Sequence, residues 1–122
     1  MDDFLDDSDG GIGYFQQLND LYDEVEQEID ALREHEYQAA DNEGTYRMLV
    51  TAKTAELRMK NVPVTVISNL VKGDTEVVQA FLAMEKTKAN AKASQHLIFL
   101  KKDKMEMLTE LIKHEWYRPS NG

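Results

Sequence analysis

The feature that most constrains this chain is the spacing of its helix breakers. After Gly13 there is no glycine until Gly44 and no proline until Pro63, and after Gly73 neither residue occurs until Pro119. Glycine and proline are the residues that most disfavour helix interiors. The two long intervals therefore predict an all-α fold: a rod-like helical hairpin, coiled-coil-like, whose antiparallel arms are joined by a short irregular tip.

Length and composition narrow the class of protein. A chain of 122 residues predicts one domain, and the absence of cysteine excludes disulfides, thiolate nucleophiles and thiolate metal ligands. The start of the chain is acidic where a signal peptide would be basic and then apolar. No run approaches the roughly 18 apolar residues that cross a bilayer. We expect a soluble cytoplasmic protein with no membrane association.

The net charge of −9 is unevenly distributed. Residues 1–61 carry 16 acidic and 5 basic side chains, whereas residues 62–122 carry 7 acidic and 9 basic ones. The two arms are electrostatically complementary, which favours pairing them. Lysines in the second arm are either nucleic-acid contacts or, in the plainer interpretation, a solvated face and salt-bridge partners for the acidic arm. They are Lys86, Lys88, Lys92, Lys101, Lys102 and Lys104.

Three segments are predicted. Residues 1–13 form a disordered acidic tail, residues 14–118 the helical hairpin domain, and residues 119–122 a frayed C-terminus. In the first arm, apolar residues spaced by three and four predict one inner face: Leu18, Leu21, Val25, Ile29 and Leu32. The turn-like cluster 41–44 either divides this arm or lies within one continuous helix, and the helical spacing that resumes at Tyr46 favours continuity.

The tip should contain a short third helix. Pro63 is expected to stop the first arm, because proline disfavours helical geometry in the residue before it. Thr65 is the predicted cap of a short helix that runs through Val71, and Gly73 is its predicted terminator. Asp74 or Thr75 is the predicted cap of the second arm.

The second arm is predicted over Thr75–Tyr117, with an inner stripe that steps by four and three. The stripe comprises positions 77, 81, 84, 88, 91, 95, 98, 102, 105, 109, 112 and 116. If residue 60 faces residue 76, Tyr46 lies opposite position 90, within an alanine-rich segment, and Leu18 to Tyr22 reach Trp116. Apolar stripes wider than one partner can cover predict a homodimer or higher oligomer, most simply a four-helix bundle.

Residues for catalysis, cofactors or metals are not apparent. His35, His96 and His114 are far apart along a hairpin, and no Glu-x-x-His motif of the kind used in four-helix metal sites occurs. A phosphate-binding loop and a nucleophile elbow are also missing. The prediction is a protein without enzymatic activity, cofactor or metal.

The tip offers more than a connection requires. It combines cationic and β-branched residues that could form a partner-binding surface at the end of the hairpin, or alternatively a plug that closes the open end of the bundle. The residues are Arg58, Lys60, Val62, Pro63, Val64, Val66 and Lys72.

Several stretches resemble a group of small helical phage and prophage early proteins of Gram-positive bacteria. They are Tyr46-Arg47, Ala52–Arg58, Val62–Thr65, Leu70–Gly73, Leu97–Lys101 and Glu115–Arg118. The resemblance covers residues 44–118, and proteins of this group often accompany recombination and replication genes. It implies a phage-infected host cytoplasm and transfers no catalytic residue.

Together these observations predict a non-enzymatic accessory or adaptor protein that acts by protein–protein interaction in phage DNA replication, recombination or host takeover. One alternative is an acidic DNA mimic that inhibits a host defence nuclease through the carboxylates of the first arm. These are Asp20, Asp23, Glu24, Glu26 and Asp30. Another is a DNA-binding accessory protein that uses the lysines within 86–104.

Overall fold

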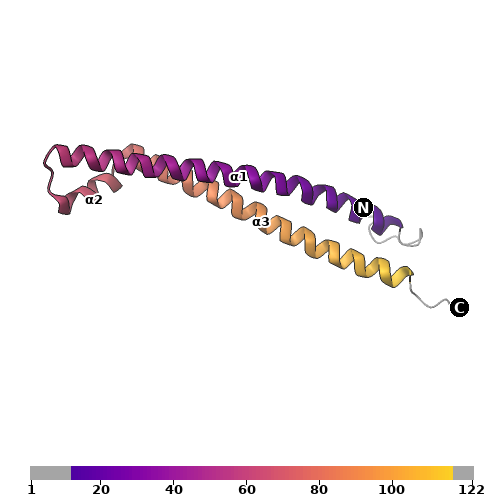
Figure 1. The fold of residues 1–122 in the computed structure, drawn as a ribbon. Helices are drawn as coiled ribbons and strands as arrows, with labels where there is room; N and C mark the ends of the chain where they lie inside the picture. Colours follow the sequence, from indigo (N-terminus) through magenta and orange to yellow (C-terminus); the bar gives the residue numbers. More distant parts are fainter. Residues whose placement is uncertain (1–11, 117–122) are drawn as a thin grey trace. The chain divides into compact units, whose positions relative to one another are not determined.

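The structure, a computed structural model, describes residues 12–116, and all regular elements within that range are helical (Figure 1). Helix α1 spans Ile12–Met59, α2 spans Val64–Lys72 and α3 spans Thr75–Trp116. The all-α prediction is confirmed. Helix α1 begins two residues earlier than predicted, and the rest of the predicted N-terminal tail and the predicted C-terminus lie outside the described residues.

The contacts divide the chain into two compact units. The tip unit comprises residues 32–93, and the described part of the terminal unit comprises residues 12–31 and 94–116. Within each unit a segment of α1 packs antiparallel to a segment of α3, as in a helical hairpin. The segment predicted as one domain, residues 14–118, therefore contains two separate clusters of contacts between residues.

Helix α1 passes through residues 41–44 without a break, which confirms the continuous alternative. Two residues of this turn-like cluster instead make contacts between helices. The Asn42 side-chain amide donates to the Ala83 carbonyl and to the Thr87 hydroxyl, both at 3.3 Å. The Glu43 carboxylate pairs with Arg47 at 2.9 Å and with Lys88 at 3.3 Å. These residues fix the pairing of α1 with α3.

Replacing Gly44 with alanine is expected to stabilise the protein by about 0.5–1 kcal/mol, because glycine in a helix interior loses more backbone entropy on folding. No atom lies within 4 Å of the position that an added Cβ would take. Urea unfolding followed by circular dichroism at 222 nm measures the change. Ala40→Gly, at an exposed position of the same helix, is the matched reverse change and should destabilise by a similar amount. A destabilising Gly44→Ala would contradict a regular helix at this residue.

Helix α1 ends in a Schellman motif. Asn61 adopts a left-handed conformation with φ of 61°, which asparagine tolerates better than most residues. The Val62 N–H donates to the Leu57 carbonyl at 3.1 Å, and the Asn61 N–H donates to the Arg58 carbonyl at 3.0 Å. Leu57 and Val62, at the two ends of this motif, also pack against the same core cluster. The helix therefore stops at Asn61, before Pro63.

Helix α2 starts directly after Pro63, so the predicted capping role of Thr65 is wrong. Pro63 occupies the N-cap with φ −57° and ψ 135°, and no side chain caps this end. Its carbonyl accepts from the Val66 N–H at 2.9 Å, which starts the helical pattern. The predicted cap of α3 is confirmed at Asp74, whose carboxylate accepts from the Glu76 and Val77 N–H groups at 2.9 and 3.2 Å.

The register between the helices in the tip unit differs from the prediction by seven residues, two helical turns. Glu76 faces Lys53, with 3.2 Å between Nζ and Oε1, whereas the prediction placed it opposite residue 60. Tyr46 packs on Phe81, with ring centroids 5.6 Å apart, and not on the alanine-rich segment around position 90. The shift arises because α2 folds back against the last turns of α1, where α3 was expected.

Half of the predicted α3 stripe is wrong by one residue. Positions 77, 84 and 98 are buried as predicted. Between these buried positions, the residues of α3 that face inward lie one position before the predicted ones. They include Thr87, Ser94, Lys101 and Leu108. The predicted positions 88, 95 and 102 are exposed. In a heptad seam the step from a to d is three residues. The predicted stripe takes the step of four first, which places Phe81 and Trp116 on it, and these residues are 42% and 64% exposed.

The terminal unit has a thin core. Leu21 and Val25 of α1 and Ile98 and Leu108 of α3 are buried, and Leu108 is fully so. Phe15, rather than the predicted Leu18 to Tyr22, meets Trp116, edge-on with ring centroids 6.1 Å apart. An ion pair between Lys101 and Glu24, at 3.3 Å, also links the helices, and Ile29 of the predicted inner face is 38% exposed.

Candidate functional site

A groove in the tip unit is a concave surface to which all three helices contribute. Residues spaced by four place one side of α1 along it: Tyr46, Val50, Thr54 and Arg58. Helix α2 supplies Val64, Ile67, Ser68, Val71 and Lys72, and α3 supplies Val77. Its volume is about 310 Å³, which is at the lower end of ligand-sized pockets. We call this surface the tip groove.

The floor of the tip groove is the core of the tip unit. Ile67, Val71 and Val77 are buried against one another, and partly buried residues of α1, among them Tyr46 and Val50, pack on them. Helix α2 has only nine residues, too few to be stable alone in water. The groove therefore exists only while the apolar face of α2 stays docked on α1 and α3.

The tip groove extends over the start of α3. A second hollow of about 310 Å³ shares Tyr46, Lys72 and Val77 with it and adds Val78 and Phe81. Val64, at the other end, is 74% exposed, and Phe81 is 42% exposed. The result is a continuous apolar surface that water covers in the isolated chain.

The charge on the tip groove is positive. Arg58 and Lys72 are the charged side chains among the described residues that line it, and no carboxylate lines it. In a chain of net charge −9 this is a local exception. The groove is suited to an apolar ligand that carries negative charge.

The structure brings some of the predicted tip residues together and separates others. Arg58, Val64 and Lys72 line the groove. Lys60 pairs with Glu56 at 3.1 Å, and Val62 is half-buried against the core. Pro63 caps α2, and Val66 is 39% exposed and does not line the groove. One face of α2 is thus buried against the core of the tip unit, as expected for a plug, and the adjoining face is exposed to solvent.

Sequence reasoning identified Arg58 but missed the other residues that α1 and α3 contribute to this site. Tyr46, Val50, Thr54 and Arg58 follow a spacing of four, which places them on one helix face. That spacing was readable from the sequence. The contribution of Val78 and Phe81 was not, because it depends on the register that α2 imposes.

An ion-pair cluster holds α1 to the start of α3. Lys53 Nζ lies 3.4 Å from Asp74 Oδ2 and 3.2 Å from Glu76 Oε1. The hydrogen bond from the Val77 N–H, followed by the charge of Lys53, lowers the pKa of Asp74. The hydrogen bond to Glu76 and the charge of Asp74 raise the pKa of Lys53. The charged forms of both groups are therefore favoured by folding.

This cluster predicts a defined pH dependence of stability. Because folding lowers the pKa of Asp74 from its ordinary 3.8, its contribution is present above that value and is lost as the pH falls through the folded pKa. Because folding raises the pKa of Lys53 from 10.5, its contribution is present below 10.5 and is lost as the pH rises through the folded pKa. Asp74→Asn, which keeps a capping side chain, should lower the melting temperature at pH 7 and have a smaller effect as the pH falls toward 2.5.

Thermal melts between pH 2.5 and 7 test this expectation, with Asp103→Asn, an exposed carboxylate of α3, as the control. Asp74→Ala should cost more than Asp74→Asn at pH 7, since alanine removes the cap as well as the charge. Equal effects of Asp74→Asn at both pH values would contradict the ionic contribution.

The six lysines proposed for nucleic-acid contact do not gather on one face. Lys86, Lys88 and Lys92 belong to the tip unit and the other three to the terminal unit. Because successive residues of an α-helix are rotated by about 100° about its axis, the six lysines point to different sides of α3. Lys88 and Lys101 pair with Glu43 and Glu24 of the acidic arm. These two pairs support the salt-bridge alternative for that part of the lysine set.

The acidic residues proposed for DNA mimicry are all exposed on α1: Asp20, Asp23, Glu24, Glu26 and Asp30. Glu24 pairs with Lys101, and Asp20 accepts a hydrogen bond from Gln16 at 3.1 Å.

The histidines lie on different parts of the chain. His35 belongs to the tip unit, and His96 and His114, both exposed, belong to the terminal unit. Among residues 12–116 no three histidine or acidic side chains gather as a metal site would require. His35 Nδ1 is buried and has no hydrogen-bond partner within the described structure.

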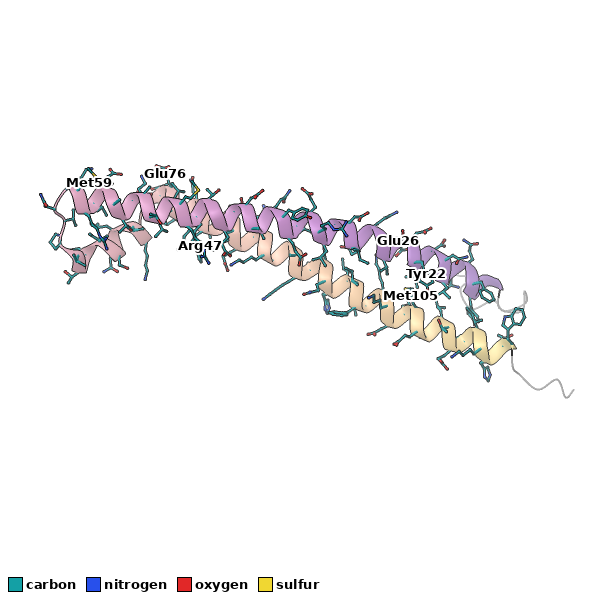
Figure 2. All side chains as sticks on the ribbon, viewed as in Figure 1. Tyr22, Glu26, Arg47, Met59, Glu76 and Met105 are labelled. Atoms are coloured by element: carbon teal, nitrogen blue, oxygen red, sulfur yellow. The ribbon has the colours of Figure 1, made fainter. Side chains whose placement is uncertain are left out.

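The terminal unit carries a shallower hollow of about 730 Å³. Tyr22 of α1 and Met105 of α3, both labelled in Figure 2, line it together with Phe99 and Thr109. Its charged lining is mixed, with one lysine and three carboxylates: Lys102, Asp103, Glu106 and Glu110. It lacks the single sign of charge that distinguishes the tip groove.

None of the helices described here is both long and apolar enough to cross a bilayer. No protein-family model, curated protein or solved structure matches this chain.

Proposed function

We propose that this chain is a non-enzymatic helical adaptor that acts by protein–protein interaction and self-associates, in phage DNA replication, recombination or host takeover. The observation that supports the proposal best is the tip groove. An apolar surface that all three helices line, with cations at its rim, has the composition of a protein-binding surface. The infection context rests on the resemblance of residues 44–118 alone.

A wider pattern of exposed apolar side chains supports the same role. Tyr22, Phe99 and Leu100 of the terminal unit are each at least half exposed, as are Leu82 and Val64 of the tip unit. Single exposed apolar residues are ordinary, but an apolar surface to which several helices contribute marks an interaction site, and the tip groove is such a surface. A second copy or another protein would cover this surface.

Site-specific photocrosslinking tests the proposal. A crosslinking amino acid at Val64, in the tip groove, is compared with one at Lys86, an exposed residue of α3 outside it. Both full-length variants are expressed in phage-infected Gram-positive cells, and the products are identified by mass spectrometry. We expect a defined protein–protein product from position 64 and none from position 86. The absence of any product specific to position 64 would overturn the proposed function.

A further inference from the structure

The tip groove and the N-terminal sequence of this chain are chemically complementary. Residues 2–7 read Asp-Asp-Phe-Leu-Asp-Asp, two large apolar residues between two pairs of carboxylates. The groove is the reverse: an apolar floor formed by Ile67 and Val71, with Arg58 and Lys72 as its only lining charges among the described residues. Apolar burial would supply affinity, and opposite charges at the rim would supply orientation and specificity.

We infer that residues 2–7 of one copy dock into the tip groove of a second copy, with Phe4 and Leu5 on the apolar floor and the flanking aspartates beside Arg58 and Lys72. This inference rests on the proposed function, because it takes the groove to be a protein-binding surface. It names the occupant of that surface as this chain itself.

The lengths of the segments favour a second copy over the same one. Residues 2–7 precede α1, whereas the residues of α1 that line the groove lie in its C-terminal half, starting at Tyr46. From its first residue, Ile12, to Tyr46, α1 rises on the order of 50 Å at 1.5 Å per residue. Eleven residues reach at most about 40 Å when fully extended. When two copies exchange their N-terminal segments, the groove of each copy is occupied by the segment of the other. The same contact then occurs twice, as in a two-fold dimer.

Sedimentation velocity on full-length variants tests the inference. The tail variant carries Phe4→Ser and Leu5→Ser, and the groove variant carries Arg58→Glu and Lys72→Glu. Each should self-associate at least about tenfold more weakly than the wild type, as expected when central contacts of an interface are removed. Lys86→Glu with Lys92→Glu makes the same change in charge outside the groove and should leave association unchanged.

Mixing the two variants gives the sharpest result. The tail variant keeps an intact groove and the groove variant keeps an intact tail, so a mixed pair retains one complete contact. The mixture should associate more strongly than either variant alone. Circular dichroism at 222 nm confirms that each variant is folded. Because the contact includes ion pairs at an exposed rim, wild-type association should also weaken with added salt.

Three outcomes would overturn the inference: a wild type that stays monomeric at every concentration, a tail variant that associates as the wild type does, or a mixture that gains nothing. A monomeric wild type would also overturn the self-association in the proposed function, whereas the other two outcomes leave the proposed function intact. If the tail has no effect but position 64 still crosslinks to another protein, the groove remains a protein-binding surface and only its occupant is wrong.

Discussion

Replacing Leu108 with alanine is expected to lower the free energy of unfolding by about 2–5 kcal/mol, the range for removing a buried leucine side chain. Leu108 is fully buried, and the terminal unit has few other buried apolar residues to compensate. Domains of ordinary stability have a free energy of unfolding of about 5–15 kcal/mol, so one such change removes a large share of it. Urea unfolding followed by circular dichroism measures the loss.

Met107 provides the matched control for this substitution. It is the preceding residue of the same helix and is 50% exposed, so Met107→Ala should cost less than about 1 kcal/mol. Hydrogen exchange should show that Leu108→Ala weakens protection in residues 12–31 and 94–116, the described part of the terminal unit, before it affects the tip unit. Equal costs for the two substitutions would contradict the burial of Leu108.

The helices themselves were predictable because their signals are local. The distribution of glycine and proline gave the three helices, and spacing within the first arm identified buried residues such as Leu21 and Val25. The continuity of α1 through Gly44 was favoured from the sequence because helical spacing resumes at Tyr46. Such features depend on residues within a few turns of one another.

The register and the full outline of the tip groove were not predictable, because they depend on contacts between distant segments. Nothing in the local sequence of α2 shows that it folds back and displaces the start of α3 by seven residues relative to α1. The hydrogen bonds from Asn42 to Ala83 and Thr87 likewise became visible only in the folded chain. For the same reason, Phe81 was assigned to the inner stripe although it lies partly exposed beside Tyr46.

The end of α1 shows a different kind of error. The sequence predicts that Pro63 stops this helix, although Asn61 already leaves it in a left-handed conformation. Asparagine is a weaker signal than glycine for this conformation, whereas proline strongly disfavours the interior of any helix. The apolar contact of Leu57 and Val62 with the core shows why the chain turns at this residue.

Replacing Ile67 with alanine is the second change with a large expected effect, about 2–4 kcal/mol in the free energy of unfolding. Ile67 is 5% exposed and belongs to the cluster that holds α2 against the other helices. Since a nine-residue helix is not stable alone, weakening this contact should undock α2. Hydrogen exchange should report faster exchange across residues 64–72, with α1 and α3 of the terminal unit still protected.

Leu70→Ala is the control for undocking, because Leu70 belongs to the same helix but is 48% exposed and does not line the groove. It should cost less than about 1.5 kcal/mol and leave α2 in place. The comparison also links stability to function, since Ile67 lies in the groove floor. Ile67→Ala should remove the photocrosslink at position 64, whereas Leu70→Ala should retain it. A photocrosslink that survives the undocking of α2 would mean that the partner binds exposed residues of α2 itself and does not require the groove.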